Sequence, residues 1–270
     1  MKRKDFFIHV ILAVAVLLTF YPFIFLIVTS LKTNDQFMHH FWGITRPFHW
    51  ENYKAAWEAI DQYILNSVIV AIFSVTGVLT VASLSAYAFA RHRFPGSTIL
   101  FYAIISLMMI PGVLTLISSF MWIKDLHLMN TRLALVLPYI AGGQVFAIFI
   151  LRSFMASIPE ELFEAARMDG ASELRMFWNI AIPLSMPILG TVAIMNLLGV
   201  WNDYIWPLIV ISDEAKRTLT IGLAFFRGTY YVNYGTLMAG YVIACLPLLV
   251  LFFIAMRYFV EGLTSGALKA

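Results

Sequence analysis

The sequence predicts an all-α, polytopic membrane protein with six transmembrane helices. Hydrophobic residues make up 61% of its 270 residues and charged residues only 12%, and the mean hydropathy of +0.84 lies outside the range of a soluble domain with a polar surface. Six long windows also lack Asp, Glu, Lys and Arg, and each has close to or more than the roughly 20 helical residues that cross about 30 Å of hydrocarbon. A closed β-barrel would instead need short strands of alternating polarity.

The charge-free windows define the individual helices within one membrane domain that covers residues 1–270. The apolar stretch after Lys4 is too long for a signal peptide and lacks a small-residue cleavage site, so we expect a retained first helix. A basic turn at residues 91–93 separates the second and third windows, and Asp203 interrupts what would otherwise be an apolar run over about residues 185–211. The predicted helices are residues 10–31, 64–90, 98–122, 133–155, 184–211 and 236–260.

The distribution of Lys and Arg predicts the orientation. Placing the N-terminus inside puts ten of the 18 Lys and Arg residues in the cytoplasm and eight outside. This excess is small, but the two densest basic runs, residues 2–4 and 91–93, then both face inward, as the positive-inside rule requires. We therefore expect a multi-pass membrane protein in contact with lipid, with both termini in the cytoplasm.

A charged segment at residues 156–183 lies between the fourth and fifth helices and reads as a short helical hairpin in water. Ser157 is suited to cap a helix that starts near Pro159, a residue favoured at the first helical position. Gly170 is expected to end this helix after Met168 in the left-handed conformation. Ser172 then caps a second short helix, which Pro183 limits or kinks.

This segment carries a spaced motif. Glu164-Ala165-Ala166 is followed by three residues, Gly170, nine residues, Ile180, and then Ile182-Pro183. The pattern resembles the EAA loop of the membrane-spanning subunits of binding-protein-dependent ABC importers, with Ile182 in place of Leu as its one departure. The run at residues 201–208 and the tail at residues 257–269 are similar to the carbohydrate-uptake branch of that family, specifically its shorter MalG-like permease.

The resemblance implies a type I ABC importer permease fold in which the loop forms a coupling helix that docks into an ATPase subunit. It implies a bacterial or archaeal plasma (inner) membrane as the location. It also implies three kinds of partner: a second permease that completes a heterodimer, dimeric ATPase subunits and an extracytoplasmic sugar-binding protein. A hairpin without a partner is the alternative. The implied ATPase-coupling residues are Glu164, Ala165, Ala166, Arg167, Asp169 and Gly170.

The chain is expected to be a transport subunit and not an enzyme. It contains no GxxxxGK[ST] phosphate-binding loop, so ATP and Mg²⁺ are expected on the partner ATPase and no cofactor on this chain. The six His residues and single Cys show no metal-binding spacing, and nothing indicates a nucleic-acid partner.

An acidic residue in an apolar run suggests a substrate path. An acidic group at membrane depth is costly, so Asp203 is a candidate functional residue by default. The neighbouring Trp201, Asn202 and Tyr204 offer an amide and flat aromatic faces suited to a sugar. The alternative is that these residues mark the outer membrane interface, where Trp and Tyr concentrate and Asp203 would lie in water.

The outer loop at about residues 212–234 is, by resemblance, where a MalG-like subunit reaches the binding protein. The implied contacts are Phe226, Arg227, Gly228 and Tyr230. Competing functions are an ABC permease for another solute, such as glycerol phosphate, a peptide or an amino acid, and a secondary transporter. The latter would need ionisable groups in several helices, and usually repeated halves, whereas Asp203 is nearly alone.

Overall fold

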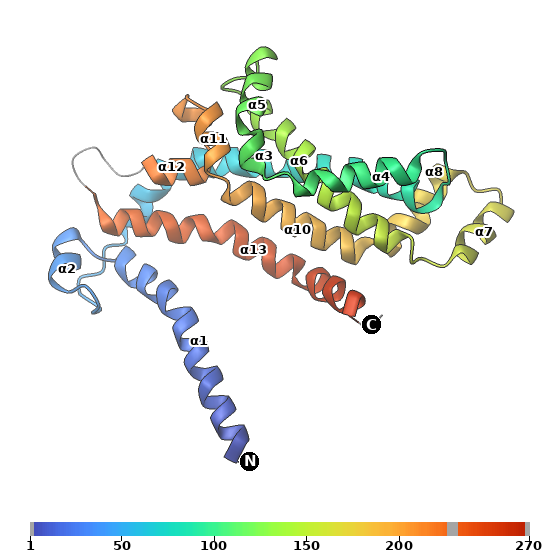
Figure 1. The fold of residues 1–270 in the computed structure, drawn as a ribbon. Coiled ribbons are helices and arrows are strands. Elements are labelled where there is room, and N and C mark those ends of the chain that lie inside the picture. Colours follow the sequence, from blue (N-terminus) through green and yellow to red (C-terminus); the bar gives the residue numbers. More distant parts are fainter. Residues whose placement is uncertain (1–2, 226–231, 268–270) are drawn as a thin grey trace. The chain divides into compact units, whose positions relative to one another are not determined.

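The structure, a computed structural model, describes residues 3–225 and 232–267 and is helical in these ranges, with no strand among them (Figure 1). The long helices are α1 (Arg3–Ser30), α3 (Glu51–Arg91), α6 (Leu133–Met155), α10 (Met186–Asn202) and α13 (Tyr234–Ala267). Between them lie the shorter α2 (Asn34–His39), α4 (Ser97–Ser106), α5 (Gly112–Asp125), α7 (Glu160–Met168), α8 (Glu173–Met176), α9 (Ile182–Leu184), α11 (Ile205–Val210) and α12 (Leu219–Phe225).

Four helices in the described ranges are long and apolar enough to cross a membrane, and two bent pairs bring the number to six if each pair is one span. The four lie at Phe7–Ser30, Glu51–Arg91, Leu133–Met155 and Tyr234–Phe253. The bent pairs are Ser97–Met109 with Gly112–Asp125, at 102°, and Glu173–Leu184 with Met186–Asn202, at 76°. The helical class and the number of apolar segments therefore agree with the prediction.

Two predicted helices are not continuous. The helix predicted at residues 98–122 breaks at Ile110, whose extended ψ of 114° reflects the steric restriction that Pro111 places on the residue before it. The helix predicted at 184–211 bends at Ser185, two residues before Pro187, which has no N–H to offer the preceding turn. The same helix ends at Asn202 because Asp203 is extended, with ψ of 126°.

The chain forms two compact units. One contains residues 1–64 and 221–249, the other residues 65–220 and 250–270. The prediction of a single membrane domain is not tested by this division and stays a prediction.

In the first unit, the start of α3 is joined to the segments at the end of α1 and the start of α13. The buried amide of Asn52 donates to the carbonyls of Ser30 and Lys32, both at 2.9 Å, and accepts from Thr236 Oγ1 at 3.3 Å. A side chain at Gly235 would collide with Asn52 and with the Lys32 backbone, so this close approach requires glycine. Helix α2, which the sequence analysis did not predict, begins with a Thr33–Gln36 capping box.

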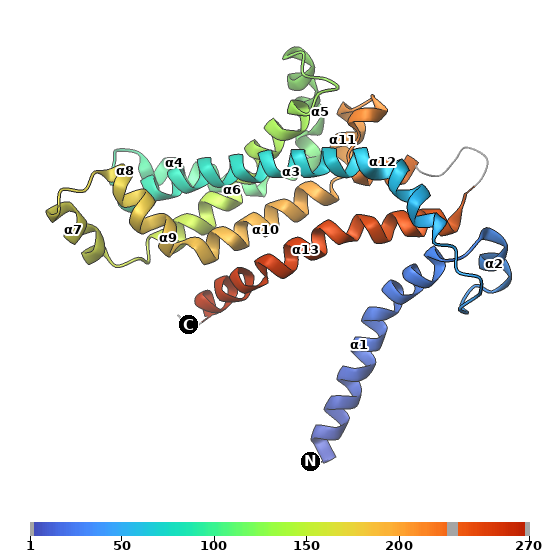
Figure 2. The same cartoon turned by 180° about the vertical axis from the view of Figure 1, so that it is seen from behind.

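In the second unit, α3, α6 and α10 pack side by side, as both ribbon views show (Figures 1 and 2). Their interface uses small buried residues, among them Ala82, Ala86 and Ala147, which let helix backbones approach closely. A side chain at Gly143 would collide with Asn196 and Val78. This three-helix core carries the loop that contains the predicted coupling motif.

Candidate functional site

The predicted hairpin is present, but its first helix starts differently from the prediction. Helix α7 begins at Glu160, and Pro159 takes the cap position with no side-chain hydrogen bond. Ser157 does not cap the helix, because it lies two residues too early to reach the first free N–H groups; its hydroxyl donates to the Phe154 carbonyl at 2.8 Å. The second predicted cap is correct, since Ser172 Oγ accepts from the Arg175 N–H at 3.4 Å.

Helix α7 ends as the sequence predicts. Gly170 has φ of +77°, and two backbone bonds close the turn: the Gly170 N–H donates to the Arg167 carbonyl at 3.0 Å and the Ala171 N–H to the Ala166 carbonyl at 2.9 Å. This is the Schellman arrangement of a helix C-terminus. No atom lies within 4 Å of the position a Cβ would take at Gly170, so glycine is needed for its backbone conformation and not for space.

The predicted coupling residues lie on the open side of α7. Five of the six are exposed, and Ala166 is half-buried against the core. Phe163 is the opposite: its side chain is 0% exposed and fixes the helix to the core. Met168, which is not among the predicted coupling residues, is 88% exposed at the end of the helix. A large apolar side chain this exposed beside the motif adds contact area for a partner.

The buried face of α7 rests on an arginine from α3. The Arg91 side chain is 5% exposed; its Nη2 donates to the carbonyls of Met155 and Ile158, both at 2.6 Å, and its Nη1 to Glu160 Oε2 at 2.8 Å. The guanidinium carbon also lies 4.0 Å from the centre of the Phe163 ring. We call these five residues the Arg91 clamp. From sequence, Arg91 contributed only to the prediction of orientation.

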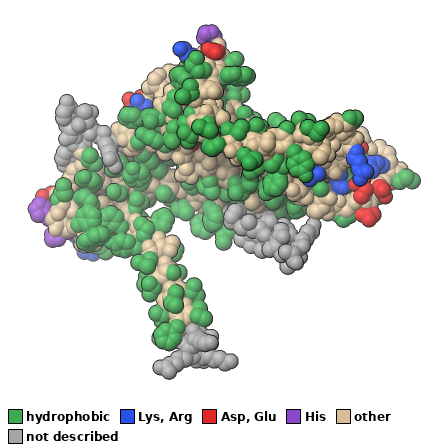
Figure 3. All heavy atoms as spheres, viewed as in Figure 1, with side chains coloured by type: hydrophobic (Ala, Val, Ile, Leu, Met, Phe, Trp, Pro, Cys, Tyr) green, Lys and Arg blue, Asp and Glu red, His purple; other side chains and the backbone are tan. Residues whose placement is uncertain are grey.

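A second layer of charges surrounds the clamp, and Figure 3 shows acidic and basic side chains gathered at this end of the unit. Arg167 Nη1 donates to Glu160 Oε1 at 3.0 Å, and Glu173 accepts from the Tyr87 hydroxyl at 3.0 Å. The hydrogen bond from Arg167, with a smaller effect from Arg91, lowers the pKa of Glu160. Glu160 therefore stays ionised at neutral pH.

The predicted substrate-path residues do not form one cluster of side chains. Trp201 is buried, and the Asn202 amide donates to the Leu198 carbonyl in its own helix at 2.9 Å. Asp203 caps α11: its Oδ1 accepts from the N–H groups of Ile205 at 3.0 Å and Trp206 at 3.3 Å. Its Oδ2 accepts from the Tyr139 hydroxyl at 2.9 Å, so Asp203 has structural partners whatever its role in transport.

A cavity of about 420 Å³ lies between α6 and α10, and Tyr139, which bonds Asp203, is one of its lining residues. Tyr139 and Asn196 supply its polar groups, and three glycines widen it. None of its lining residues is charged; they are Pro138, Tyr139, Gly142, Gly143, Phe146, Met195, Asn196, Gly199 and Val200. A polyol could find hydrogen-bond partners here, whereas an anion would find no positive charge.

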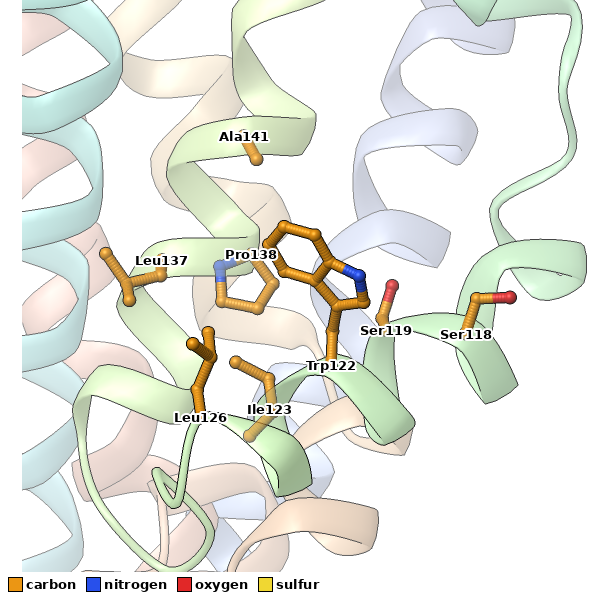
Figure 4. A pocket seen from close by; sticks show the side chains of 8 residues that line it. All are labelled: Ser118, Ser119, Trp122, Ile123, Leu126, Leu137, Pro138 and Ala141. Carbon is orange, nitrogen blue, oxygen red and sulfur yellow. The ribbon is translucent and has the colours of Figure 1, made fainter.

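A second cavity, of about 360 Å³, lies between α5 and α6 and is almost wholly apolar (Figure 4). In Figure 4 the Trp122 ring lies beside Pro138, and the polar side chains in view are Ser118, Ser119 and the indole nitrogen. This lining does not suit a sugar, because it offers few hydrogen-bond partners for hydroxyl groups. The predicted binding-protein contacts Phe226, Arg227, Gly228 and Tyr230 lie outside the described residues.

Residues 79–265 match the family described as "Binding-protein-dependent transport system inner membrane component", and the chain belongs to this family. It is 31% identical over 267 residues to the diacetylchitobiose uptake system permease protein NgcG of Streptomyces coelicolor, covering 97% of this chain and 88% of that protein. It is also 31% identical over 276 residues to the sn-glycerol-3-phosphate transport system permease protein UgpE of Yersinia pestis, covering 98% of each chain.

The fold is that of a type I ABC importer permease. The structure superposes with a TM-score of 0.83 on a chain of a bacterial ABC transporter involved in the import of the acidic polysaccharide alginate, covering 96% of this chain and 99% of that one at 23% identity. The family and fold predicted from the EAA motif are thus confirmed. The chain is a membrane transport component with several spanning segments.

Proposed function

We propose that this chain is the membrane-spanning subunit of an ATP-driven importer for a sugar or oligosaccharide, coupled to its ATPase through α7. The observation that carries the proposal is the construction of α7: an exposed motif face, a left-handed glycine that ends it, and a buried face fixed by Phe163 and the Arg91 clamp. A charged helix in water held this firmly against a membrane core is suited to receive a partner.

The cavity between α6 and α10 favours a neutral sugar over the main alternative, glycerol phosphate. Its polar groups are a phenol and an amide, with no cation to meet a phosphate. The carboxylate of Asp203 lies next to it, bonded to Tyr139, and would repel a phosphate. Trp201, Asn202, Asp203 and Tyr204 remain the proposed path residues, and Asp203 is joined to the cavity through its hydrogen bond from Tyr139.

The proposed assembly contains this chain, a second permease, two ATPase subunits that hold ATP and Mg²⁺, and an extracytoplasmic sugar-binding protein. This chain itself binds no cofactor and no nucleic acid, and both its termini lie in the cytoplasm. Phe226, Arg227, Gly228 and Tyr230 are proposed to face the binding protein. A mass measurement of the purified complex tests the heterodimer, and a transporting homodimer of this chain would refute it.

The coupling role of α7 is tested by two substitutions at Gly170. Gly170→Val places a β-branched residue at φ of +77°, which costs about 1–2 kcal/mol, and should impair uptake while the chain still inserts in the membrane. Gly170→Asn is the matched control, because Asn tolerates this conformation, and should retain most of the uptake. Reconstituted complexes are assayed for ATPase association and for uptake of labelled sugar. Normal uptake by the Val variant would refute the assignment.

A further inference from the structure

Arg91 joins segments that are far apart in the sequence. It is the last residue of α3, yet its side chain contacts the end of α6 at Met155, the connection at Ile158, and α7 at Glu160 and Phe163. Arg91 and Glu160 are 69 positions apart. The chain itself links α7 to α6 and α8, so any force that passes from α7 to α3 must cross non-covalent contacts.

We infer that Arg91 is a positioning residue for coupling: it holds α7 against α3, so that movement of α7 by a docked ATPase also moves α3. This rests on the proposed docking of α7. The planar guanidinium fixes three acceptors at once, which a flexible ammonium cannot do with the same geometry. Its charge also lies at the C-terminal end of α6, where the helix dipole favours a cation.

The burial of the contact supports a mechanical role. Two hydrogen bonds of 2.6 Å end on backbone carbonyls, and the side chain is 5% exposed, so water cannot readily replace it. Removing it would leave the carbonyls of Met155 and Ile158 without this donor and would free Phe163 on one side. Arg167 differs, because its side chain bonds Glu160 from within α7 itself, and none of the hydrogen bonds among the described residues joins that side chain to α3.

Arg93 provides a matched control within the same basic turn. It is exposed, two residues from Arg91, and makes no hydrogen bond or ion pair in the part of the chain that the structure describes. A general need for positive charge at this turn would make both arginines matter equally. The inferred clamp makes only Arg91 matter.

The test uses the complete importer, with both permeases, ATPase and binding protein, reconstituted in vesicles. Sugar uptake per ATP hydrolysed is compared for Arg91→Ala, Arg91→Lys and Arg93→Ala, each normalised to assembled complex. We expect Arg91→Ala to continue hydrolysing ATP while uptake per ATP falls by about tenfold, within the usual range of coupling between sites. Arg91→Lys should fall less, and Arg93→Ala should match the wild type. The binding-protein concentration that gives half-maximal uptake should not change.

If Arg91→Ala does not assemble, Arg91→Lys tests the positioning role of Arg91. A lowered uptake per ATP in the assembled Arg91→Lys complex supports this role, and a wild-type uptake per ATP overturns it. Equal losses in Arg91→Ala and Arg93→Ala would also overturn it. The Gly170→Val variant separates this inference from the proposed function. If Gly170→Val impairs uptake but Arg91→Ala leaves uptake per ATP unchanged, only the inference fails; if Gly170→Val transports normally, the docking role of α7 fails first.

Discussion

The part of α3 that belongs to the second unit, residues 65–91, is held at its two ends by different chemistry. Near one end Asn66, a neutral and fully buried amide, donates to the carbonyls of Ala215 at 2.8 Å and Arg217 at 3.0 Å and accepts from Arg132 Nη2 at 2.8 Å. At the other end the Arg91 clamp includes Glu160, whose side chain is 50% exposed. The amide at the centre of the first attachment is closed to solvent, and the second attachment has a charged edge in reach of water.

The difference distinguishes an attachment that holds α3 in place from one that could pass movement between α7 and α3. At Asn66 the hydrogen-bonding groups of the amide meet protein partners in a buried site, so opening the contact would leave several polar groups unsatisfied. At the clamp, Arg91 supplies the buried attachment, while Glu160 and Arg167 can exchange partners at modest cost because water solvates them. An attachment of the second kind suits the proposed role of α7, in which another subunit moves the helix.

The largest effect is expected at the buried amide. Asn66→Asp keeps the shape and the acceptor for Arg132, but removes two donors and faces two carbonyls with a carboxylate. Placing a carboxylate at this fully buried position, opposite two carbonyl oxygens, should cost about 2–5 kcal/mol of the free energy of unfolding. Thermal unfolding of the detergent-solubilised chain measures it. The same change at the exposed Asn179 should shift stability by less than about 0.5 kcal/mol; equal melting temperatures for the two variants would contradict the comparison.

An intermediate effect is expected at Asp203. Asp203→Asn keeps an oxygen to cap α11 and should retain most uptake, whereas Asp203→Leu removes the cap, worth about 1–2 kcal/mol, and leaves the Tyr139 hydroxyl without its acceptor. We expect the Leu variant to lose most of its sugar uptake per assembled complex. Tyr139→Phe tests the pair from the other side. Near-normal uptake by Asp203→Leu would leave the substrate-path proposal without support.

The smallest effect is expected at the charged edge of the clamp. Because the pKa of Glu160 is lowered from 4.5 by Arg167 and Arg91, its ion pairs stabilise the fold at neutral pH and are lost as the pH falls through that lowered value. Glu160→Gln should therefore destabilise the chain at pH 7 by about 1 kcal/mol or less, and less at high salt. The difference should vanish at strongly acidic pH. Glu161→Gln, at an exposed neighbour, is the control for unfolding at low salt, and identical behaviour of the two variants would count against the ion pairs.

Much of the fold and the coupling loop could be predicted from the sequence, because the signals are local. The apolar windows, the stop at Gly170 and the cap at Ser172 depend on residues within a few positions of one another. The wrong predictions also have local causes, which hydropathy and residue type alone do not show. Pro111 and Pro187 break helices that composition alone shows as continuous, and Ser157 lies too far from the start of α7 to cap it.

The sequence by itself determined the class of protein, the family and the position of the EAA-like motif, since hydropathy and motif spacing are properties of short stretches of chain. Only the tertiary structure decided that Arg91 meets Glu160 across 69 positions, that Asp203 meets Tyr139 across 64, and that Asn66 meets Ala215 across 149. Each of these contacts depends on which faces of α3, α6 and α10 pack together, and that choice is made by the close fit of small residues such as Gly143 and Ala147, whose partners lie in other helices.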